Sequence, residues 1–275
     1  MKLTVALLGN PNTGKSTLFS AIAGIPTRIG NYPGVTVEEK VGQFHYQGKT
    51  IELIDLPGTY SLNAKSPDEQ VAVDVLHGGM AAMDRPDCIV VVADATNLSR
   101  NLYLVSQALA VGQPVLVALT LCDVAESKGI HINREKLSRC LGCPVIRLVA
   151  PRREGIDQLA DALIQSSEWS EQIIPESLSS HLAKTVDSDR PAASADAIAR
   201  YGWIDEIMKD VLSYSVQQSR SLGDRIDSVL THRVLGTVVF ALTMLSIFSS
   251  IFWLASPLMN LVSGCVEFTA GWAES

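Results

Sequence analysis

The apolar positions of the chain form short, nearly uninterrupted runs, and segments with a helical period lie between them. Runs of this kind are typical of parallel strands that are buried on both faces. The alternation predicts an α/β fold with a doubly wound, mostly parallel sheet that binds ligands at the carboxyl ends of its strands. The predicted strands are 2–8, 88–93, 114–121 and 145–149, and the predicted helices are 18–24, 98–111, 133–141 and 155–164.

Two segments near the start depart from this alternation. Residues 37–46 and 50–54 alternate polar and apolar positions, and a tight turn at 47–49 joins them, which predicts a hairpin at the edge of the sheet. Residues 26–36 are rich in glycine, proline and asparagine, a composition that favours turns and mobility over regular structure. We interpret this second segment as a candidate switch loop.

The second half of the chain begins with a change of composition. Residues 166–191 are rich in serine, glutamate, aspartate and proline, which predicts a linker with one weak helix near 177–184. Residues 195–215 carry an apolar stripe at three- and four-residue spacings. This stripe predicts a helix that packs on another helix or domain.

The last segment is long, apolar and uncharged between Arg233 and Glu267. Residues 234–256 are long enough to cross a bilayer as a helix, and a fully buried helix of a soluble domain is the alternative. The basic residues Arg225 and Arg233 precede this segment, so the positive-inside tendency places the preceding domain on the cytoplasmic side. The residues after Pro257 are compatible with an amphipathic tail at the membrane surface.

The composition disfavours one class of partner. The chain has 22 lysines and arginines against 29 aspartates and glutamates, a net charge of −7, which argues against a nucleic-acid partner. Five cysteines, three of them in or beside apolar runs, indicate reduced, intracellular thiols. We interpret the lone pair Cys140 and Cys143 as a helix end and a strand start; half of a zinc or redox site is the alternative.

The first candidate chemistry follows the first predicted strand. The pattern Gly-x-x-x-x-Gly-Lys-Ser predicts a phosphate-binding loop, because its glycines let backbone N–H groups face the α and β phosphates of a nucleotide. Lys15 would reach the β and γ phosphates, Ser16 would ligate Mg²⁺, and the following helix adds a favourable dipole. The loop residues are Gly9, Asn10, Pro11, Asn12, Thr13, Gly14, Lys15, Ser16 and Thr17.

A second candidate motif follows the predicted hairpin and consists of Asp55, Leu56, Pro57 and Gly58. A carboxylate at a strand end that faces the phosphate loop suits Mg²⁺ binding. Gly58 would let a backbone N–H approach a γ phosphate. A simple turn is the alternative for Asp-x-Pro-Gly, and the preceding phosphate loop favours the metal.

Together these motifs resemble a small GTPase of the translation-factor-related class. More closely, the chain resembles the N-terminal part of FeoB-type ferrous iron transport proteins. The segments that carry this resemblance are 9–17, Asn31-Tyr32-Pro33-Gly34-Val35-Thr36-Val37-Glu38, 55–62, and 224–227 with His232 and Arg233. The resemblance implies a P-loop GTPase domain at 1–165, a linker and helical spacer domain at 166–225, and a membrane segment at 226–275.

The resemblance also implies roles for individual residues. Thr36, beside Gly34 and Val35, would ligate Mg²⁺ and contact the γ phosphate, and Asp55 would hold a Mg²⁺-bound water. Asn12 is similar in position to an asparagine that helps to coordinate K⁺ in potassium-activated relatives, where the cation neutralises charge as an arginine finger does elsewhere. Thr59 stands where Ras-like enzymes have a water-positioning glutamine, so slow hydrolysis is expected. The residues expected to be catalytic are Asn12, Lys15, Thr36 and Gly58.

The two motifs that would read the base depart from the family pattern, which has Asn-x-x-Asp and Ser-Ala. The chain has instead Thr120, Leu121, Cys122 and Asp123, and then Val149, Ala150 and Pro151. Asp123 can still accept the ring N–H and the exocyclic amine of guanine, and the Ala150 N–H could meet the guanine carbonyl. Thr120 cannot reproduce an asparagine amide, so one tie to base and loop is expected to be missing or altered. GTP remains the expected nucleotide, with weakened discrimination against others.

The resemblance implies a membrane-tethered GTPase that uses Mg²⁺ and K⁺ and drives or gates ferrous iron uptake at the inner (plasma) membrane. Its partners would be GTP and GDP, the membrane, and the remaining permease part or small accessory iron-transport proteins, with a homo-oligomer left open. One membrane helix cannot form a permease, so a fragment, a truncated product or one piece of a split system is expected. The alternatives are a nucleotide-sensing module with little turnover and a soluble GTPase of RNA modification or ribosome assembly.

Overall fold

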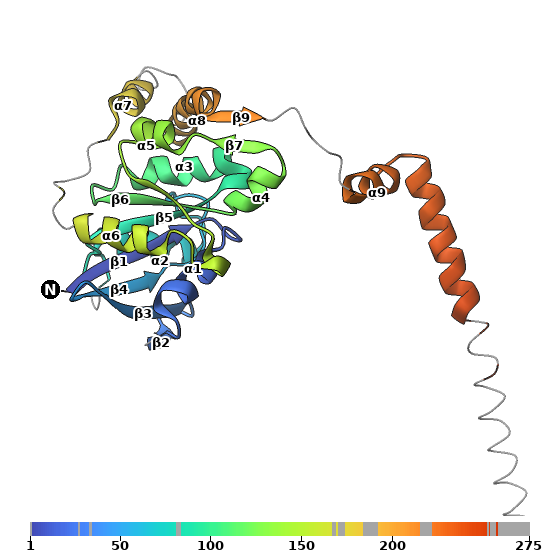
Figure 1. The fold of residues 1–275 in the computed structure, drawn as a ribbon, viewed down its shortest axis with the longest axis horizontal. Helices are drawn as coiled ribbons and strands as arrows, with labels where there is room; N and C mark the ends of the chain where they lie inside the picture. The colour runs from blue at the N-terminus through green and yellow to red at the C-terminus, as the bar shows by residue number, and fades with distance from the viewer. Residues whose placement is uncertain are drawn as a thin grey trace, which may run out of the picture. The chain divides into compact units, whose positions relative to one another are not determined.

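The computed structural model of the chain describes residues 2–26, 28–32, 35–80, 84–166, 169, 174–183, 192–214, 222–251, 253 and 257. The chain divides into two compact units between Val216 and Gln217. The first unit holds a central sheet with helices on both faces (Figure 1).

Seven strands form the central sheet, in the order β2-β3-β4-β1-β5-β6-β8. The five strands from β4 to β8 in this order are parallel, whereas β2 and β3 run antiparallel at one edge. The predicted α/β fold with a mostly parallel sheet is therefore confirmed. The strands are β1 Lys2–Gly9, β2 Arg28–Asn31, β3 Glu38–Tyr46, β4 Lys49–Asp55, β5 Cys88–Asp94, β6 Val115–Thr120 and β8 Val145–Arg147.

The central strands are apolar throughout because each contributes to two hydrophobic cores. In β1, Ala6 and Leu8 point into one core, while Val5 and Leu7 point into the other. The same alternation holds in β5 and β6. Since successive side chains of a strand face opposite sides of a sheet, an uninterrupted apolar run fills both layers.

Helices cover both faces of the sheet. Side chains of α1 and α6 belong to one core, and side chains of α2, α3 and α5 belong to the other. Short 3-10 helices at Ala95–Asn97 and Ala150–Arg152 follow β5 and β8. The helices are α1 Lys15–Ala23, α2 Pro67–His77, α3 Leu98–Ala108, α4 Cys122–Ser127, α5 Arg134–Leu141 and α6 Ile156–Ser166.

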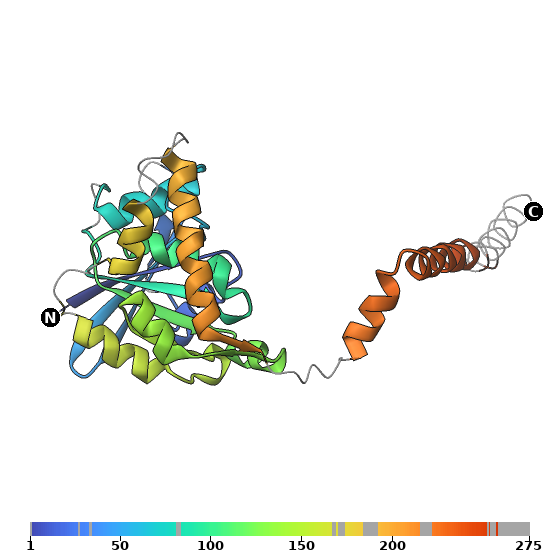
Figure 2. The same ribbon diagram turned by 90° about the horizontal axis from the view of Figure 1, so that it is seen from above.

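Two further helices, α7 Glu176–Ala183 and α8 Ala192–Val211, lie side by side and belong to the same compact unit as the sheet (Figure 2). Trp203 of α8 is buried, and its indole N–H donates to the Ser177 hydroxyl at 2.9 Å. Ile204 and Ile207 join the core that contains α3 and α5. The predicted apolar stripe is thus confirmed as a packing surface at its carboxyl-terminal part, whereas Ile198 and Tyr201 of the stripe are exposed.

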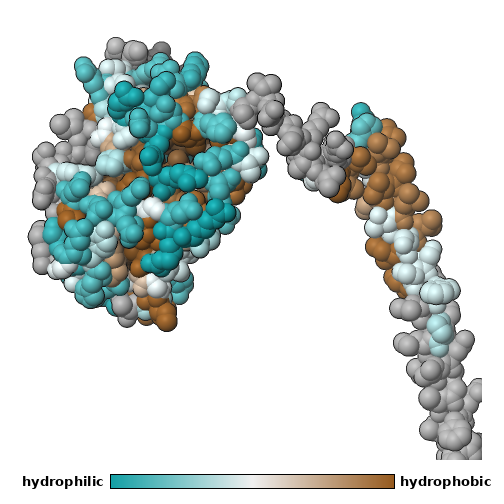
Figure 3. Space-filling model, viewed as in Figure 1, coloured by the Kyte–Doolittle hydropathy of each residue, from teal (hydrophilic) through white to brown (hydrophobic). Residues whose placement is uncertain are grey.

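The second unit contains α9 Leu222–Leu230 and a helical stretch at 235–251. Apolar side chains are exposed along this stretch, including Phe240 at 66% and Leu245 at 65% (Figure 3). The predicted membrane segment 234–256 lies partly outside the described residues. Among the residues that are described, no helix combines the length and the apolar character that crossing a bilayer requires. The membrane helix and the amphipathic tail remain predictions.

The two irregular segments near the start have different outcomes. The hairpin of β3 and β4 is confirmed, with Gln47 and Gly48 at φ 48° and 75° in its turn. The prediction of a loop throughout 26–36 is wrong in part, because β2 lies within it and pairs with β3. Edge pairing supplies backbone hydrogen bonds there, and Arg28 forms an ion pair with Glu39. Thr27, Pro33 and Gly34 lie outside the described residues.

Several elements of the first unit have no counterpart among the predicted ones. α2 carried a readable signal, since Ser66 accepts a hydrogen bond from the Glu69 N–H and Pro67 occupies the first turn. The short α4 carried none. β7 Ile130–Ile132 and β9 Leu212–Tyr214 pair with each other in a two-stranded antiparallel sheet, a contact between segments far apart in sequence.

The positions of Cys140 and Cys143 agree with their interpretation as a helix end and a strand start. Cys140 lies in the last turn of α5 and Cys143 lies shortly before β8, and both are free thiols. Burial raises the pKa of the Cys143 thiol to about 12. Cys265 lies outside the described residues.

We expect Trp203→Ala to lower the free energy of unfolding by about 3–5 kcal/mol, because Trp203 is only 1% exposed and its removal leaves a large cavity. Urea unfolding followed by circular dichroism would measure this change. Tyr214→Ala is the control, since Tyr214 is 69% exposed and should change stability by less than about 0.5 kcal/mol. A loss below about 1 kcal/mol for Trp203→Ala would contradict cooperative folding of α8 with the sheet.

Candidate nucleotide-binding site

The predicted phosphate loop connects the end of β1 to the start of α1. A Cβ atom on Gly9 would lie 2.9 Å from the Val92 carbonyl oxygen, so only glycine fits there. Gly14, directly before α1, has φ 83°, which also favours glycine. The Thr13 hydroxyl donates to the Asn10 carbonyl at 2.9 Å and closes the turn. The sequence pattern and the backbone shape therefore agree.

The first turn of α1 supplies the donors of an anion site. No side chain caps this helix end, so its first backbone N–H groups lack helical partners. Ser16 and Thr17 are exposed there. Unpaired amides and the positive end of the helix dipole favour a phosphate at this position.

Asp55 lies at the carboxyl end of β4, beside Leu7 of β1. The side chain is buried, and its carboxylate forms an ion pair with the Lys15 ammonium. The predicted position of this carboxylate, facing the phosphate loop, agrees with that contact. The carboxylate of Asp55 and the hydroxyl of Ser16 are hard oxygen donors that fit Mg²⁺.

The metal would need more ligands than these two residues. Among the described residues, no cluster of three or more His, Cys, Asp or Glu side chains could hold a metal ion. Mg²⁺ commonly takes one or two protein ligands and completes its shell with waters and substrate phosphates. The donor set therefore suits a metal that arrives with a nucleotide.

The segment after Asp55 packs directly on the phosphate loop. The Thr59 N–H donates to the Gly9 carbonyl at 3.2 Å. A Cβ atom on Gly58 would lie 3.3 Å from atoms of Pro11, so the two backbones approach closely. These contacts bring Gly58 beside the phosphate loop, and the approach of its N–H to a γ phosphate stays a prediction.

The Thr59 hydroxyl is already engaged by its own segment. It lies 2.6 Å from the Ser61 carbonyl and 3.1 Å from the Glu69 carboxylate. Glu69 also accepts the Lys65 N–H at 2.9 Å. Thr59 is buried, so it holds this loop together and is not placed as a glutamine that orients water would be. Glu69 is a site residue that the sequence motifs do not single out.

The candidate switch loop is anchored by Tyr32. This side chain is buried, and its hydroxyl lies 3.4 Å from the Asp55 carbonyl. Burial, and then the charge of Glu39 and Asp55, raises the pKa of Tyr32 far above its usual range, so the hydroxyl keeps its proton. Thr36 is exposed, and no hydrogen bond within the described residues joins it to Lys15, Ser16 or Asp55. The role of Thr36 as a Mg²⁺ ligand therefore stays a prediction.

Thr120 connects the base-reading segment to the phosphate loop. Its buried hydroxyl lies 2.7 Å from the Thr13 carbonyl oxygen and 3.2 Å from the Ala93 carbonyl oxygen. A hydroxyl has one proton, so it donates to the nearer oxygen. A threonine hydroxyl thus makes the tie to the phosphate loop in place of an asparagine amide, which agrees with the expectation of a missing or altered tie.

The turn after Thr120 has an uncommon backbone conformation. Leu121 has φ 55° and precedes α4, whereas Cys122 is buried with its thiol 3.3 Å from the Leu119 carbonyl. Asp123 follows in the first turn of α4 and is half-buried. This turn places Asp123 at the carboxyl end of β6, near the edge that also carries the phosphate loop.

The third predicted segment opens the 3-10 helix Ala150–Arg152, and Val149 and Ala150 are buried. Arg153 fastens it to α1, because its guanidinium donates to the Ala21 carbonyl at 2.7 Å. A cation at a helix carboxyl end is favourable. Arg153 is a second residue that the motifs do not reveal.

These segments share one edge of the sheet. The phosphate loop, 55–59 and Thr120–Asp123 follow β1, β4 and β6, which are parallel strands of the same sheet (Figure 1). Hydrogen bonds join the first segment to each of the other two. The geometry can hold a phosphorylated nucleotide with its metal.

Comparison with known proteins agrees with this site. The family model described as ferrous iron transport protein B matches residues 3–163. The Fe(2+) transporter FeoB of Escherichia coli (strain K12) is 44% identical over 202 residues, which cover 69% of this chain and 25% of that protein. A Porphyromonas gingivalis fusion of Fe(2+) transport protein A and Fe(2+) transporter FeoB is 32% identical over 337 residues, covering 99% of this chain and 39% of the fusion.

The fold is similar to that of a solved relative. The cytosolic domain of the T. maritima FeoB iron transporter in a GDP form has a TM-score of 0.67 and 28% identity, covering 78% of this chain and 100% of that one. The chain spans about a quarter to two fifths of the length of the two curated relatives above. Because the family model covers more than half of the chain, at residues 3–163, the chain belongs to the ferrous iron transport protein B family.

Proposed function

We propose that the chain binds GTP with Mg²⁺ and hydrolyses it slowly, and that this cycle drives or gates ferrous iron uptake. The observation that carries the proposal is the convergence of the phosphate loop, the Asp55 segment and the Thr120 segment at one edge of the sheet. The T. maritima relative is described in GDP and GMPPNP forms, which supports a guanine nucleotide as the ligand.

The residues take separate roles in this proposal. Residues 9–17 hold the phosphates through backbone N–H groups and Lys15. Ser16 and Asp55 hold the Mg²⁺, and Thr36 joins them when its loop closes on the nucleotide. Asp123 accepts the two guanine N–H donors, and the Ala150 N–H meets the guanine carbonyl.

At the position after Gly58 the chain has Thr59 rather than a glutamine that could orient the attacking water. The engaged hydroxyl of Thr59 supports slow hydrolysis. Asn12 is exposed in the phosphate loop at φ 66°, and within the described part of the chain its side chain makes no hydrogen bond that would keep its oxygen from a cation beside the phosphates. Asn12 would hold K⁺ there, and the ion would supply positive charge for the transition state, as an arginine finger does in other enzymes.

The link to iron and to the membrane comes from the relatives and from the second unit. The curated relatives are named as Fe(2+) transporters, and one is a fusion with Fe(2+) transport protein A, which suggests an accessory partner of that kind. Exposed apolar side chains along 235–251 would be covered in a bilayer or by the rest of a permease. We therefore place the chain at the plasma membrane with the nucleotide-binding unit on the cytoplasmic side.

A nucleotide-sensing module with relaxed base specificity is a second candidate. One observation favours it. The Thr120 hydroxyl donates its proton to the Thr13 carbonyl, so Thr120 has no proton to donate to a base, and base recognition at this turn falls to Asp123. The two candidates differ in turnover, because a sensor would bind nucleotide without sustained hydrolysis.

We expect phosphate release from GTP to be about tenfold or more faster in K⁺ than in Na⁺, because K⁺ at Asn12 neutralises developing charge. Asn12→Ala should remove the difference and leave the rate in Na⁺ within about twofold of the original chain. Multiple-turnover assays in matched chloride salts would measure both. Equal rates in the two salts would contradict the role of K⁺, and absence of turnover in both would favour the sensor.

We expect Thr120→Val to weaken the binding of GDP and of ADP by the same factor, about tenfold. The substitution leaves the buried Thr13 carbonyl unpaired and changes no contact with the base. Thr120→Ser keeps the hydroxyl and should restore both affinities. Titration calorimetry would give the constants. Asp123→Ala is the contrasting variant and should weaken GDP alone. A change in the GDP-to-ADP ratio for Thr120→Val would overturn the assignment of Thr120 as a loop tie.

A further inference from the structure

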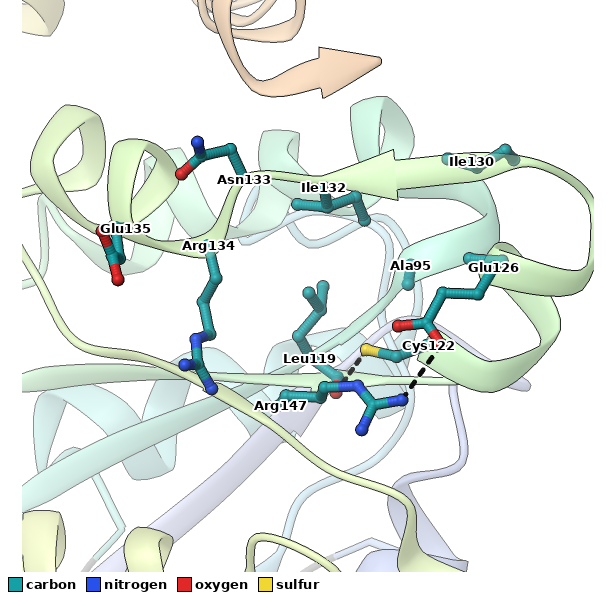
Figure 4. A pocket seen from close by; sticks show the side chains of 11 residues that line it. Ala95, Leu119, Cys122, Glu126, Ile130, Ile132, Asn133, Arg134, Glu135 and Arg147 are labelled. Carbon is teal, nitrogen blue, oxygen red and sulfur yellow. Dashed lines mark hydrogen bonds and ion pairs between the residues drawn. The ribbon is translucent and has the colours of Figure 1, made fainter. Parts of the chain in front are cut away.

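A cavity of about 410 Å³ adjoins the base-reading turn but is separate from the phosphate loop (Figure 4). Cys122 and Glu126 of α4 line it, whereas Leu121, Asp123 and residues 9–17 do not. Its other walls come from the end of β6, from β7, from the start of α5 and from the end of β8. None of the proposed nucleotide contacts uses this space.

The walls combine an apolar surface with cationic groups. Leu119, Ile130 and Ile132 supply the apolar part. Arg134 and Arg147 both line the cavity, and the Arg147 side chain extends toward Glu126 (Figure 4). Arg134 is exposed, and it forms no ion pair or hydrogen bond within the described residues. An apolar body with one anionic group would match both features.

Arg147 has one donor that the protein does not use. Its terminal nitrogens pair with Glu126 at 3.2 Å and Glu154 at 3.5 Å. Its Nε atom is buried and has no hydrogen-bond partner among the described residues. A buried N–H without an acceptor is unfavourable, and a ligand could supply the acceptor only after the Arg147 side chain moves, because this atom exposes almost no surface to the cavity.

The two arginines and two glutamates that line the cavity carry no net charge together, and the cationic group that no described residue pairs is that of Arg134. Glu126 is already paired with Arg147. Glu135 lies at the far end of the cavity from Cys122 (Figure 4). The amino end of α5, capped by Asn133, adds partial positive charge at the same wall.

We propose that this cavity binds a small organic anion, a carboxylate or phosphate monoester with a compact apolar body, and that its binding changes nucleotide affinity through α4. The cavity volume lies within the usual range of small-molecule sites, roughly 300–1,000 Å³. Anion binding in the cavity does not depend on the proposed function, whereas the change in nucleotide affinity rests on it.

The coupling follows from the position of Cys122. This residue stands between Leu121, held at φ 55°, and Asp123. A left-handed leucine persists only where its surroundings hold it, and the buried thiol bonded to Leu119 is part of that support. Burial raises the pKa of Cys122 to about 11, so the thiol keeps its proton as a donor. A ligand against Cys122 and Glu126 would therefore act on the turn that carries Asp123.

The binding test uses benzoate and phenyl phosphate as anionic probes and benzamide as a neutral probe of the same shape. Titration of the full chain in detergent, followed by NMR or calorimetry, should give binding for at least one anion and about tenfold weaker binding for benzamide. Which anion binds more tightly distinguishes a carboxylate from a phosphate ligand. If benzamide bound as tightly as the two anions, the proposal would be overturned.

The variant test compares two arginines of the same helix. Arg134→Gln should weaken binding of the anionic probe about fivefold or more. Arg139 does not line the cavity, so Arg139→Gln should leave the probe's affinity unchanged. Both positions are exposed, and equal unfolding midpoints would show that both variants fold. Equal binding by the Arg134→Gln variant and the unchanged chain would overturn the assignment.

The coupling test measures GDP affinity with and without saturating anion. A change of about threefold or more supports coupling, and GDP must then change the anion affinity by the same factor. Anion binding with unchanged GDP affinity would overturn the coupling. A chain that binds the anion but no nucleotide would refute the proposed function and leave the cavity assignment intact.

Discussion

The close contact between the phosphate loop and its neighbouring strands is the constraint on which the site depends. Gly9 passes so near the Val92 carbonyl that a methyl group would not fit. The Gly9 carbonyl accepts the Thr59 N–H, and the Thr13 carbonyl accepts the Thr120 hydroxyl. Because the loop is tied on both sides, its N–H groups are held open for phosphate before any ligand arrives, which lowers the ordering cost of binding.

Helix α3 stands between the segment after Gly58 and helix α8. On one side Gln107 accepts the Leu62 N–H at 2.8 Å, and Arg100 lies over the Tyr60 ring. On the other side Arg200 of α8 donates to the Ser106 carbonyl at 2.7 Å. α8 therefore packs on the helix that holds the segment after Gly58. This explains why the sheet and α8 form one compact unit.

The predictable parts of the fold and site are those fixed by local pattern. Buried strands such as β5 must be apolar throughout, so their runs are legible in the sequence. The phosphate loop is legible because its two glycines meet steric needs that no other residue satisfies. The composition of β2 predicts a loop, but this four-residue edge strand is extended because it pairs with β3.

The sequence by itself determined the sheet, the phosphate loop and the carboxylate that meets Lys15, because each depends on residue type and spacing. Only the tertiary structure decided what Thr120 and Thr59 do. A hydroxyl can bond to any acceptor within reach, and Thr120 finds its partner 107 residues away. The cavity beside Cys122 was likewise decided by tertiary structure, since Ala95 and five successive elements, β6, α4, β7, α5 and β8, meet around it. Contacts of this kind follow from chain topology, which local patterns do not encode.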